Sequence, residues 1–385
     1  MSTVVMFSAA RSAFGHRVLV SLVLATLAGC ATSGPITVAT VPDPNPTRAA
    51  GGNSVSRATP AGGWGVDTRE HVDLWLHGFA LLQDDASLVP YFRLGYRASL
   101  LQVRPAVGGT LDANRQQLQR RFAENPNLTS AQFLALYFAT WADMRRGVDR
   151  FLADGGDIRA ARNAEEVRMY ATIRTYFSTV GDRDWLRLFM SALEDERTRF
   201  YRAYWLQQQQ LRASVRTQVT SLWTGTYRGA FTRFMRNTTQ RDGSILLSLP
   251  LGGEGRTLSV GQRDNFVTVT FPAPGDDARD ALFVVAHEIV GSVATAAVRD
   301  NSSAADERSG ETGKWTTLAA VRGGAMLLER VAPDLLDGYQ RYYLKIARVA
   351  PVNGDPRATF VATFPLPAQI ASALQRQIVL VLEGI

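Results

Sequence analysis

The sequence predicts a helix-rich α+β protein, and three observations support that prediction. Apolar side chains recur at helical spacing from residue 64 to about residue 223, which is typical of helices that bury one face. Residues 226–272 then hold short segments rich in β-branched and aromatic residues, separated by turn-forming dipeptides. Helical spacing returns from residue 278. We therefore expect an N-terminal helical bundle, followed by a small antiparallel sheet packed on helices.

Start signals mark several helices of the N-terminal half. Asp67-Thr-Arg-Glu70 and Asn163-Ala-Glu-Glu166 have the pattern of a capping box, in which side chains satisfy the free amides of the first turn. Asp182 or Asp184 starts a long helix that continues to about Trp223. These signals predict that residues 64–223 form a helical region.

Three or four antiparallel strands are expected between residues 226 and 272. Asp242-Gly243 and Gly252-Gly253 supply turns between them. The candidate strand segments are TYRGAFTRFMRNT, SILLSLPL, RTLSVGQ and NFVTVTFP. Helices are then expected over residues 278–298, 314–331 and 333–347, with a last one starting at Pro367. Residues 224–385 are thus predicted to form the α+β region.

The first thirty residues read as an export signal and not as part of the fold. Arg11 and Arg17 precede a short apolar run, Val18 to Ala28, as in secretory signals. That run is too short to span a membrane as a helix. It closes with LAGC, which resembles the lipobox of bacterial lipoproteins. The resemblance implies that residues 1–30 are the signal and that Cys30 is acylated, for example with palmitate, and becomes the new N-terminus.

The lipobox resemblance also implies a location. Because Ala31, and not an aspartate, follows Cys30, we expect an outer-membrane lipoprotein of the cell envelope, on the periplasmic or the surface face. Its first partner would be membrane lipid. The alternative is an ordinary secreted protein whose cysteine is incidental.

Residues 31–63 are rich in Pro, Gly, Ser, Thr and Ala. Such a segment buries too little apolar surface to fold, so it predicts a flexible tether. The formal net charge is +7, but the arginines are interleaved with acids along the helices, so we expect no nucleic-acid binding. With one cysteine in the chain, no intrachain disulfide is possible and a packed core must supply the stability.

A histidine and a glutamate lie at the centre of the apolar helix expected over residues 278–298. His287 and Glu288 are costly inside a core unless something compensates for their burial. A metal, a catalytic water or a hydrogen-bond network would each compensate. A membrane span is disfavoured, because a glutamate in lipid costs several kcal/mol.

The order of elements around this pair resembles the gluzincin family of zinc metallopeptidases. In that family a small sheet precedes a helix with the motif HExxH, and a later helix carries a glutamate ligand. The resemblance implies that His287 and Glu329 hold zinc and that Glu288 is the general base. Gly291 stands where the second histidine belongs, and glycine has no side chain that could bind a metal.

Three interpretations follow. We favour a degenerate, zincin-like domain that either binds a protein or peptide of the envelope or has a structural role. For such a domain no cofactor is expected. A second is an active zinc peptidase with an unusual third ligand. In the third, His287 and Glu288 are simply hydrogen-bonded in an unrelated core.

Two weaker signals lie in the helical region. Asp73 and His77 are four residues apart, so on a helix they share a face and could support a metal or a hydrogen bond. The aromatic run Phe200 to Trp205 is expected to pack in the core. The alternative for the run is a surface that binds a peptide or glycan.

Overall fold

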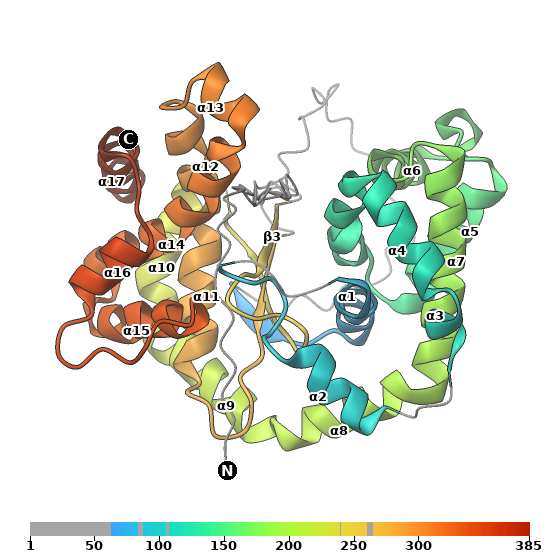
Figure 1. The fold of residues 1–385 in the computed structure, drawn as a ribbon, viewed down its shortest axis with the longest axis horizontal. Coiled ribbons are helices and arrows are strands. Elements are labelled where there is room, and N and C mark those ends of the chain that lie inside the picture. Colours follow the sequence, from blue (N-terminus) through green and yellow to red (C-terminus); the bar gives the residue numbers. More distant parts are fainter. Residues whose placement is uncertain (1–62, 84–87, 105–107, 239, 260–264) are drawn as a thin grey trace, which may run out of the picture.

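A small mixed sheet lies between two groups of helices (Figure 1). The computed structural model describes residues 63–83, 88–104, 108–238, 240–259 and 265–385. Cys30 and nearly all of the expected tether lie outside these residues. The strands are β1 (Gly65–Asp67), β2 (Gly243–Ser248), β3 (Arg256–Ser259) and β4 (Asn265–Thr270), in the spatial order β1-β2-β4-β3. The helix-rich α+β class expected from the sequence is confirmed.

The expected antiparallel arrangement of the sheet is wrong for most of it. β2 pairs in parallel with both β1 and β4, and only the edge strand β3 is antiparallel to its neighbour β4. The chain leaves β2, forms β3 at the edge and returns through β4 between them, so β4 runs in the direction of β2. Both inner strands are almost wholly buried, which is typical of parallel strands covered on both faces.

The first expected strand is also wrong, because that segment forms helix α10 (Arg228–Asn237). Its buried residues are Phe231, Phe234 and Met235. They lie three and four positions apart, which is the spacing of one helical face. The helical period therefore outweighed the β propensity of the individual residues.

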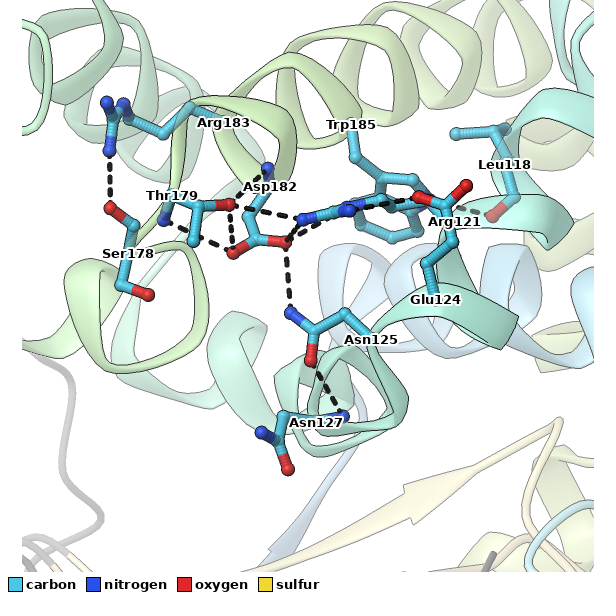
Figure 2. A network of polar contacts seen from close by, with 10 residues as sticks. All are labelled: Leu118, Arg121, Glu124, Asn125, Asn127, Ser178, Thr179, Asp182, Arg183 and Trp185. Atoms are coloured by element: carbon cyan, nitrogen blue, oxygen red, sulfur yellow. Dashed lines mark hydrogen bonds and ion pairs between the residues drawn. The ribbon is translucent and has the colours of Figure 1, made fainter.

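The N-terminal helices cover one face of the sheet. Asp182 joins three of them, as Figure 2 shows. Its carboxylate accepts hydrogen bonds from Arg121, Asn125 and Thr179, which lie in or beside different helices. The elements of this group are α1 (Glu70–Leu82), α2 (Tyr96–Val103), α3 (Thr110–Ala113), α4 (Arg115–Glu124), η1 (Pro126–Tyr137), α5 (Trp141–Ala153), η2 (Ile158–Ala160), α6 (Ala164–Tyr176) and α7 (Val180–Glu196).

A long helical run connects the two groups below the sheet in Figure 1. It starts with α7, as the expected helix from Asp182 implied, and continues past Trp223 into α10. Two π-helical turns interrupt it, and α8 is separated from α9 at Arg212. Its later parts are η3 (Arg197–Tyr201), α8 (Arg202–Leu211), α9 (Ala213–Leu222) and η4 (Trp223–Tyr227).

The C-terminal helices cover the other face of the sheet. α11 packs on β4, and α14 and α17 pack on α11 or α12. Among the described residues, Arg279–Arg299 is the one helical stretch long and apolar enough to cross a membrane. Most of it is buried inside the protein, as expected for a central helix. The group comprises α11 (Arg279–Ile289), α12 (Gly291–Arg299), α13 (Ala304–Ser309), α14 (Glu311–Val331), η5 (Pro333–Leu335), α15 (Leu336–Ile346), α16 (Arg357–Thr363) and α17 (Ala368–Glu383).

The two faces of the sheet differ in chemistry. Side chains alternate between the faces along each strand. The face toward the C-terminal helices, which we call the apolar face, is formed by Ile245, Leu247, Val267, Val269 and Phe271. The face toward the N-terminal helices, which we call the polar face, carries Leu246, Phe266 and Leu258, and by alternation also Ser248, Arg256, Thr268 and Thr270.

Candidate functional site

The His287–Glu288 pair ties helix α11 to the edge strand β3. The Glu288 carboxylate accepts a hydrogen bond of 2.8 Å from the backbone amide of Gly255, just before β3. The same oxygen lies 2.9 Å from Nδ1 of His287. The hydroxyl of Thr257, on β3, donates to the backbone carbonyl of Glu288 at 3.3 Å. The Glu288 side chain and its backbone carbonyl are therefore both engaged by the segment around β3.

Glycine at position 255 is required for this approach. A Cβ there would clash with the carbonyl oxygen of Thr268 and would lie 2.9 Å from Cγ of Glu288. The helix and the strand can therefore approach closely enough for the amide–carboxylate bond only because residue 255 lacks a side chain.

The His287 ring is buried and packs against helix α15. Its exposed fraction is 3 %, and it stacks on the ring of Tyr343 with centroids 5.5 Å apart. Tyr343 in turn donates a hydrogen bond of 2.8 Å to the carbonyl of Gly253. The second ring nitrogen of His287, Nε2, is buried without a hydrogen-bond partner among the described residues.

A buried arginine occupies the other side of β3. The guanidinium of Arg256 stacks on the ring of Tyr91 and lies 4.5 Å from the centroid of Phe133. Its nearest carboxylate contact is Glu254, at 3.8 Å. Burial lowers the pKa of Arg256 well below its usual value, although the charge of Glu288 acts in the opposite direction.

The structure does not bring the predicted metal ligands together. Glu329 is half-exposed and forms an ion pair of 3.2 Å with Arg357, whereas His287 contacts Glu288 and Tyr343. Gly291 offers no ligand. In the part of the chain that the structure describes, no group of three or more His, Cys, Asp or Glu side chains is placed to hold a metal ion. His287 Nε2 is thus a nitrogen that could bind zinc, but the described residues around it supply no further set of ligands.

His77, from the first of the two weaker signals, belongs to a buried polar network. Its ring nitrogens lie 3.1 Å from the hydroxyl of Tyr96 and 3.2 Å from the carboxylate of Glu196. Arg104 forms two further bonds to Glu196, of 2.6 and 2.7 Å. Burial alone would raise the pKa of Glu196, but bonds from His77 and Arg104 lower it to about 2.

Asp73 contacts a different element from His77, although both lie on α1. The carboxylate of Asp73 accepts a 2.9 Å hydrogen bond from the indole of Trp205, on α8. The ring of His77 instead packs on Tyr201, in η3, with ring centroids 4.4 Å apart. Asp73 and His77 thus share no ligand. Instead, α1 and the aromatic run, far apart in sequence, lie together in the fold. Core packing, the expected role of the run, holds for Tyr201, which is fully buried.

A second polar cluster lies where strands β2 and β4 end, and sequence reasoning missed it. Arg93 donates to the hydroxyl of Thr270 at 3.2 Å, and Arg212 lies over the ring of Phe271 at 5.8 Å. No motif marks these arginines, which are 119 positions apart. Scans against protein-family models, curated proteins and solved structures found no match to this chain.

Proposed function

We propose that this chain is a lipid-anchored cell-envelope protein whose body is not a peptidase and serves binding or structure. The supporting observation is the position of Glu288. A general base must be free to take a proton from a catalytic water. The Glu288 carboxylate is instead bonded to the Gly255 amide and to His287.

The order of elements still agrees with a degenerate gluzincin. The sheet precedes α11 with its His-Glu pair, and α14 with Glu329 follows. In this proposal the pair has kept a structural role, because it joins the central helix to the edge strand. The lipobox-like LAGC at Leu27 to Cys30 supports the anchor.

Bound zinc tests the catalytic half of the proposal. We expect the purified mature chain to contain well under one equivalent of zinc by elemental analysis, with no decrease in His287→Ala. His71→Ala is the matched control, because His71 is also buried but bonds to the carbonyl of Phe138. One equivalent of zinc that disappears only in His287→Ala would overturn the non-catalytic reading.

That same outcome would support the second candidate, a zinc-dependent peptidase with an atypical third ligand. The observation in its favour is Nε2 of His287, which is buried and unpartnered among the described residues. His287 and Glu329 would then have to meet in a conformation in which the ion pair with Arg357 is broken.

Lipid labelling tests the anchor. Cells given an alkyne-tagged fatty acid should label the wild-type chain and the control Thr32→Ala, and Cys30→Ser should lose the label. Cys30→Ser should also move from the membrane fraction to the soluble fraction. Equal labelling of Cys30→Ser and wild type would contradict the lipoprotein assignment.

A further inference from the structure

The polar cluster at the ends of β2 and β4 is a second site, separate from the His-Glu pair. Both strands run in the same direction and end at Ser248 and Thr270. The crevice outside the carboxyl ends of parallel strands is where open α/β sheets bind ligands. Both terminal residues carry hydroxyls and are buried on the polar face, at 1 % and 4 % exposure.

Arg212 contributes a buried positive charge to this cluster. It lies where α8 ends and is only 9 % exposed. One guanidinium nitrogen donates to the side chain of Gln208. Its Nε is buried and has no hydrogen-bond partner among the described residues. Burying a charged donor without an acceptor costs free energy.

Arg93 places a second guanidinium nearby. It donates to the hydroxyl of Thr270 and to the carbonyl of Phe271, the residue whose ring underlies Arg212. Burial, and after it the charge of Arg93, lowers the pKa of Arg212. Within the described ranges, no carboxylate forms an ion pair with either arginine.

The charges of Asp276 and Asp73 act on Arg212 against its burial, and the surrounding carboxyl groups compensate only partly for the two arginine charges. Burial raises the pKa of Asp73 to about 7, although the neighbouring hydroxyl of Ser248 and the hydrogen bond from Trp205 act in the opposite direction. Burial also raises the pKa of Asp280 to about 7, and the charges of Asp277 and Asp276 add to this effect. Near neutral pH, Asp73 and Asp280 are therefore only partly ionised.

The rim of the cluster is accessible and aromatic. Tyr204 and Trp205 are half-buried and contact the hydrophobic cores on both sides of the sheet. Arg93 is also half-buried. These three side chains therefore keep part of their surface in solvent, whereas Arg212 lies deeper.

We propose that Arg93 and Arg212, together with the hydroxyl of Thr270, bind the oxyanion of a small molecule, either a carboxylate or a phosphate. Guanidinium groups suit both anions, because they donate several hydrogen bonds in one plane. The orphaned Nε of Arg212 would gain an acceptor. The rings of Tyr204 and Trp205 would contact the remainder of the ligand.

Thermal unfolding of the full mature chain in detergent tests this proposal. Inorganic phosphate is the probe in one arm and succinate in the other, both at constant ionic strength. We expect a saturable rise of Tm in at least one arm, and the responding arm identifies the anion. Arg212→Lys keeps the charge but loses the planar donor set, so the apparent Kd should rise about ten- to hundredfold.

Arg216→Lys is the matched control, because Arg216 lies one turn further along and is exposed. It should bind as wild type does, whereas Arg93→Gln should weaken binding as strongly as Arg212→Lys. Two outcomes would overturn the proposal: no saturable shift of the wild type in either arm, or unchanged binding by Arg212→Lys. Neither result depends on zinc or on acylation of Cys30, so this test is independent of the proposed function.

Discussion

The two sides of the sheet show two ways of filling the interior of one protein. Toward the C-terminal helices, the inner strands present aliphatic and aromatic side chains along their centres, and the polar contact described on this side is that of Thr257, on the edge strand, with Glu288. Toward the N-terminal helices, threonine, serine and arginine interrupt the apolar residues, and the helices bring buried acids and histidines. The buried charged or ionisable side chains that contact α1 or its neighbours include His71, Asp73, His77, Glu166, Asp182 and Glu196.

This difference shows that one face of the sheet contributes mainly to stability, whereas the polar groups that could bind a ligand lie elsewhere. Burying apolar area is favourable wherever it occurs, whereas each buried polar group needs a partner. Both sites argued above involve polar groups at the margins of the sheet, His287–Glu288 at the edge strand and Arg93–Arg212 at the strand ends. The centre of the apolar face contains no such group among the described residues, so we assign it to stability alone.

Truncation on the apolar face should cause the largest loss of stability. Leu247→Ala removes a side chain that is 1 % exposed and should lower the free energy of unfolding by about 3 kcal/mol, through lost burial and a residual cavity. Urea unfolding measures this. Leu206→Ala, at a leucine that is 50 % exposed, should change it by less than about 0.5 kcal/mol. Equal effects would contradict the assignment of this face to the core.

Next in size, loss of the Asp182 charge should loosen the N-terminal helices. Asp182→Asn breaks the bond to Arg121 shown in Figure 2 and should cost about 2 kcal/mol at pH 7. Burial would raise the pKa of Asp182, but bonds from Thr179, Asn125 and Arg121 lower it. The carboxylate therefore stabilises the fold above its unfolded pKa, and this stabilisation disappears as the pH falls through the lowered folded pKa.

Urea unfolding over a series of pH values from 7 downward measures this effect, and the gap between wild type and Asp182→Asn should narrow as the pH falls through the lowered folded pKa. Asp184→Asn is the control on the same helix. Its ion pair with Arg187 is exposed, so it should cost less than about 0.5 kcal/mol. A gap of constant size over the whole acid range would mean that the asparagine damages the fold in another way.

The contribution of Asp73 to stability should change with pH in the direction opposite to that of Asp182. Its folded pKa is raised to about 7, above an unfolded value of about 4, so the folded state holds the proton more tightly. Stability is therefore lost as the pH rises between these values. Because the asparagine in Asp73→Asn cannot ionise, the free energy of unfolding of this variant should rise relative to wild type over this pH range, by up to about 1.4 kcal/mol per pH unit. Parallel pH profiles of the two proteins would show that Asp73 is not the buried acid described here.

The smallest effect, and the most direct comparison of the two faces, comes from neighbouring residues of β4. Val267→Thr places a hydroxyl among the apolar side chains described on this face and should cost about 1–2 kcal/mol. Thr268→Val removes a buried hydroxyl that has no partner among the described residues, and should be neutral or stabilising. Thermal unfolding of both variants measures the contrast. If Thr268→Val were the costlier change, the polar face would depend on this hydroxyl.

The sequence was most informative where the pattern was long and periodic. The helix ending at Val331 and the last helix after Pro367 form as expected, and the central helix expected over residues 278–298 forms as α11 and α12, which meet at Val290. The strand segments of β2, β3 and β4 were also found. Strand β1, at Gly65–Asp67, was missed because three residues carry no detectable alternation.

Sites proved harder to predict than elements. The side chain of Glu329 is expected to lie close to His287, because Glu329 is on the next long helix. In the structure it faces solvent and forms an ion pair with Arg357. Helical spacing fixes which residues share a face of one helix. It does not fix how that face is rotated toward a neighbouring helix, so the meeting of two side chains from different helices could not be predicted.

What the sequence by itself determined is local: the succession of helices and strands, the central buried helix, and the expectation that its two polar residues need partners. Hydrophobic period and start signals carry that information along the chain. Only the tertiary structure decided that β4 inserts between β2 and β3, that Glu288 bonds to the amide of Gly255, and that Arg93 lies close to Arg212. These are contacts between segments distant in sequence, and they depend on how whole elements pack, which no local pattern encodes.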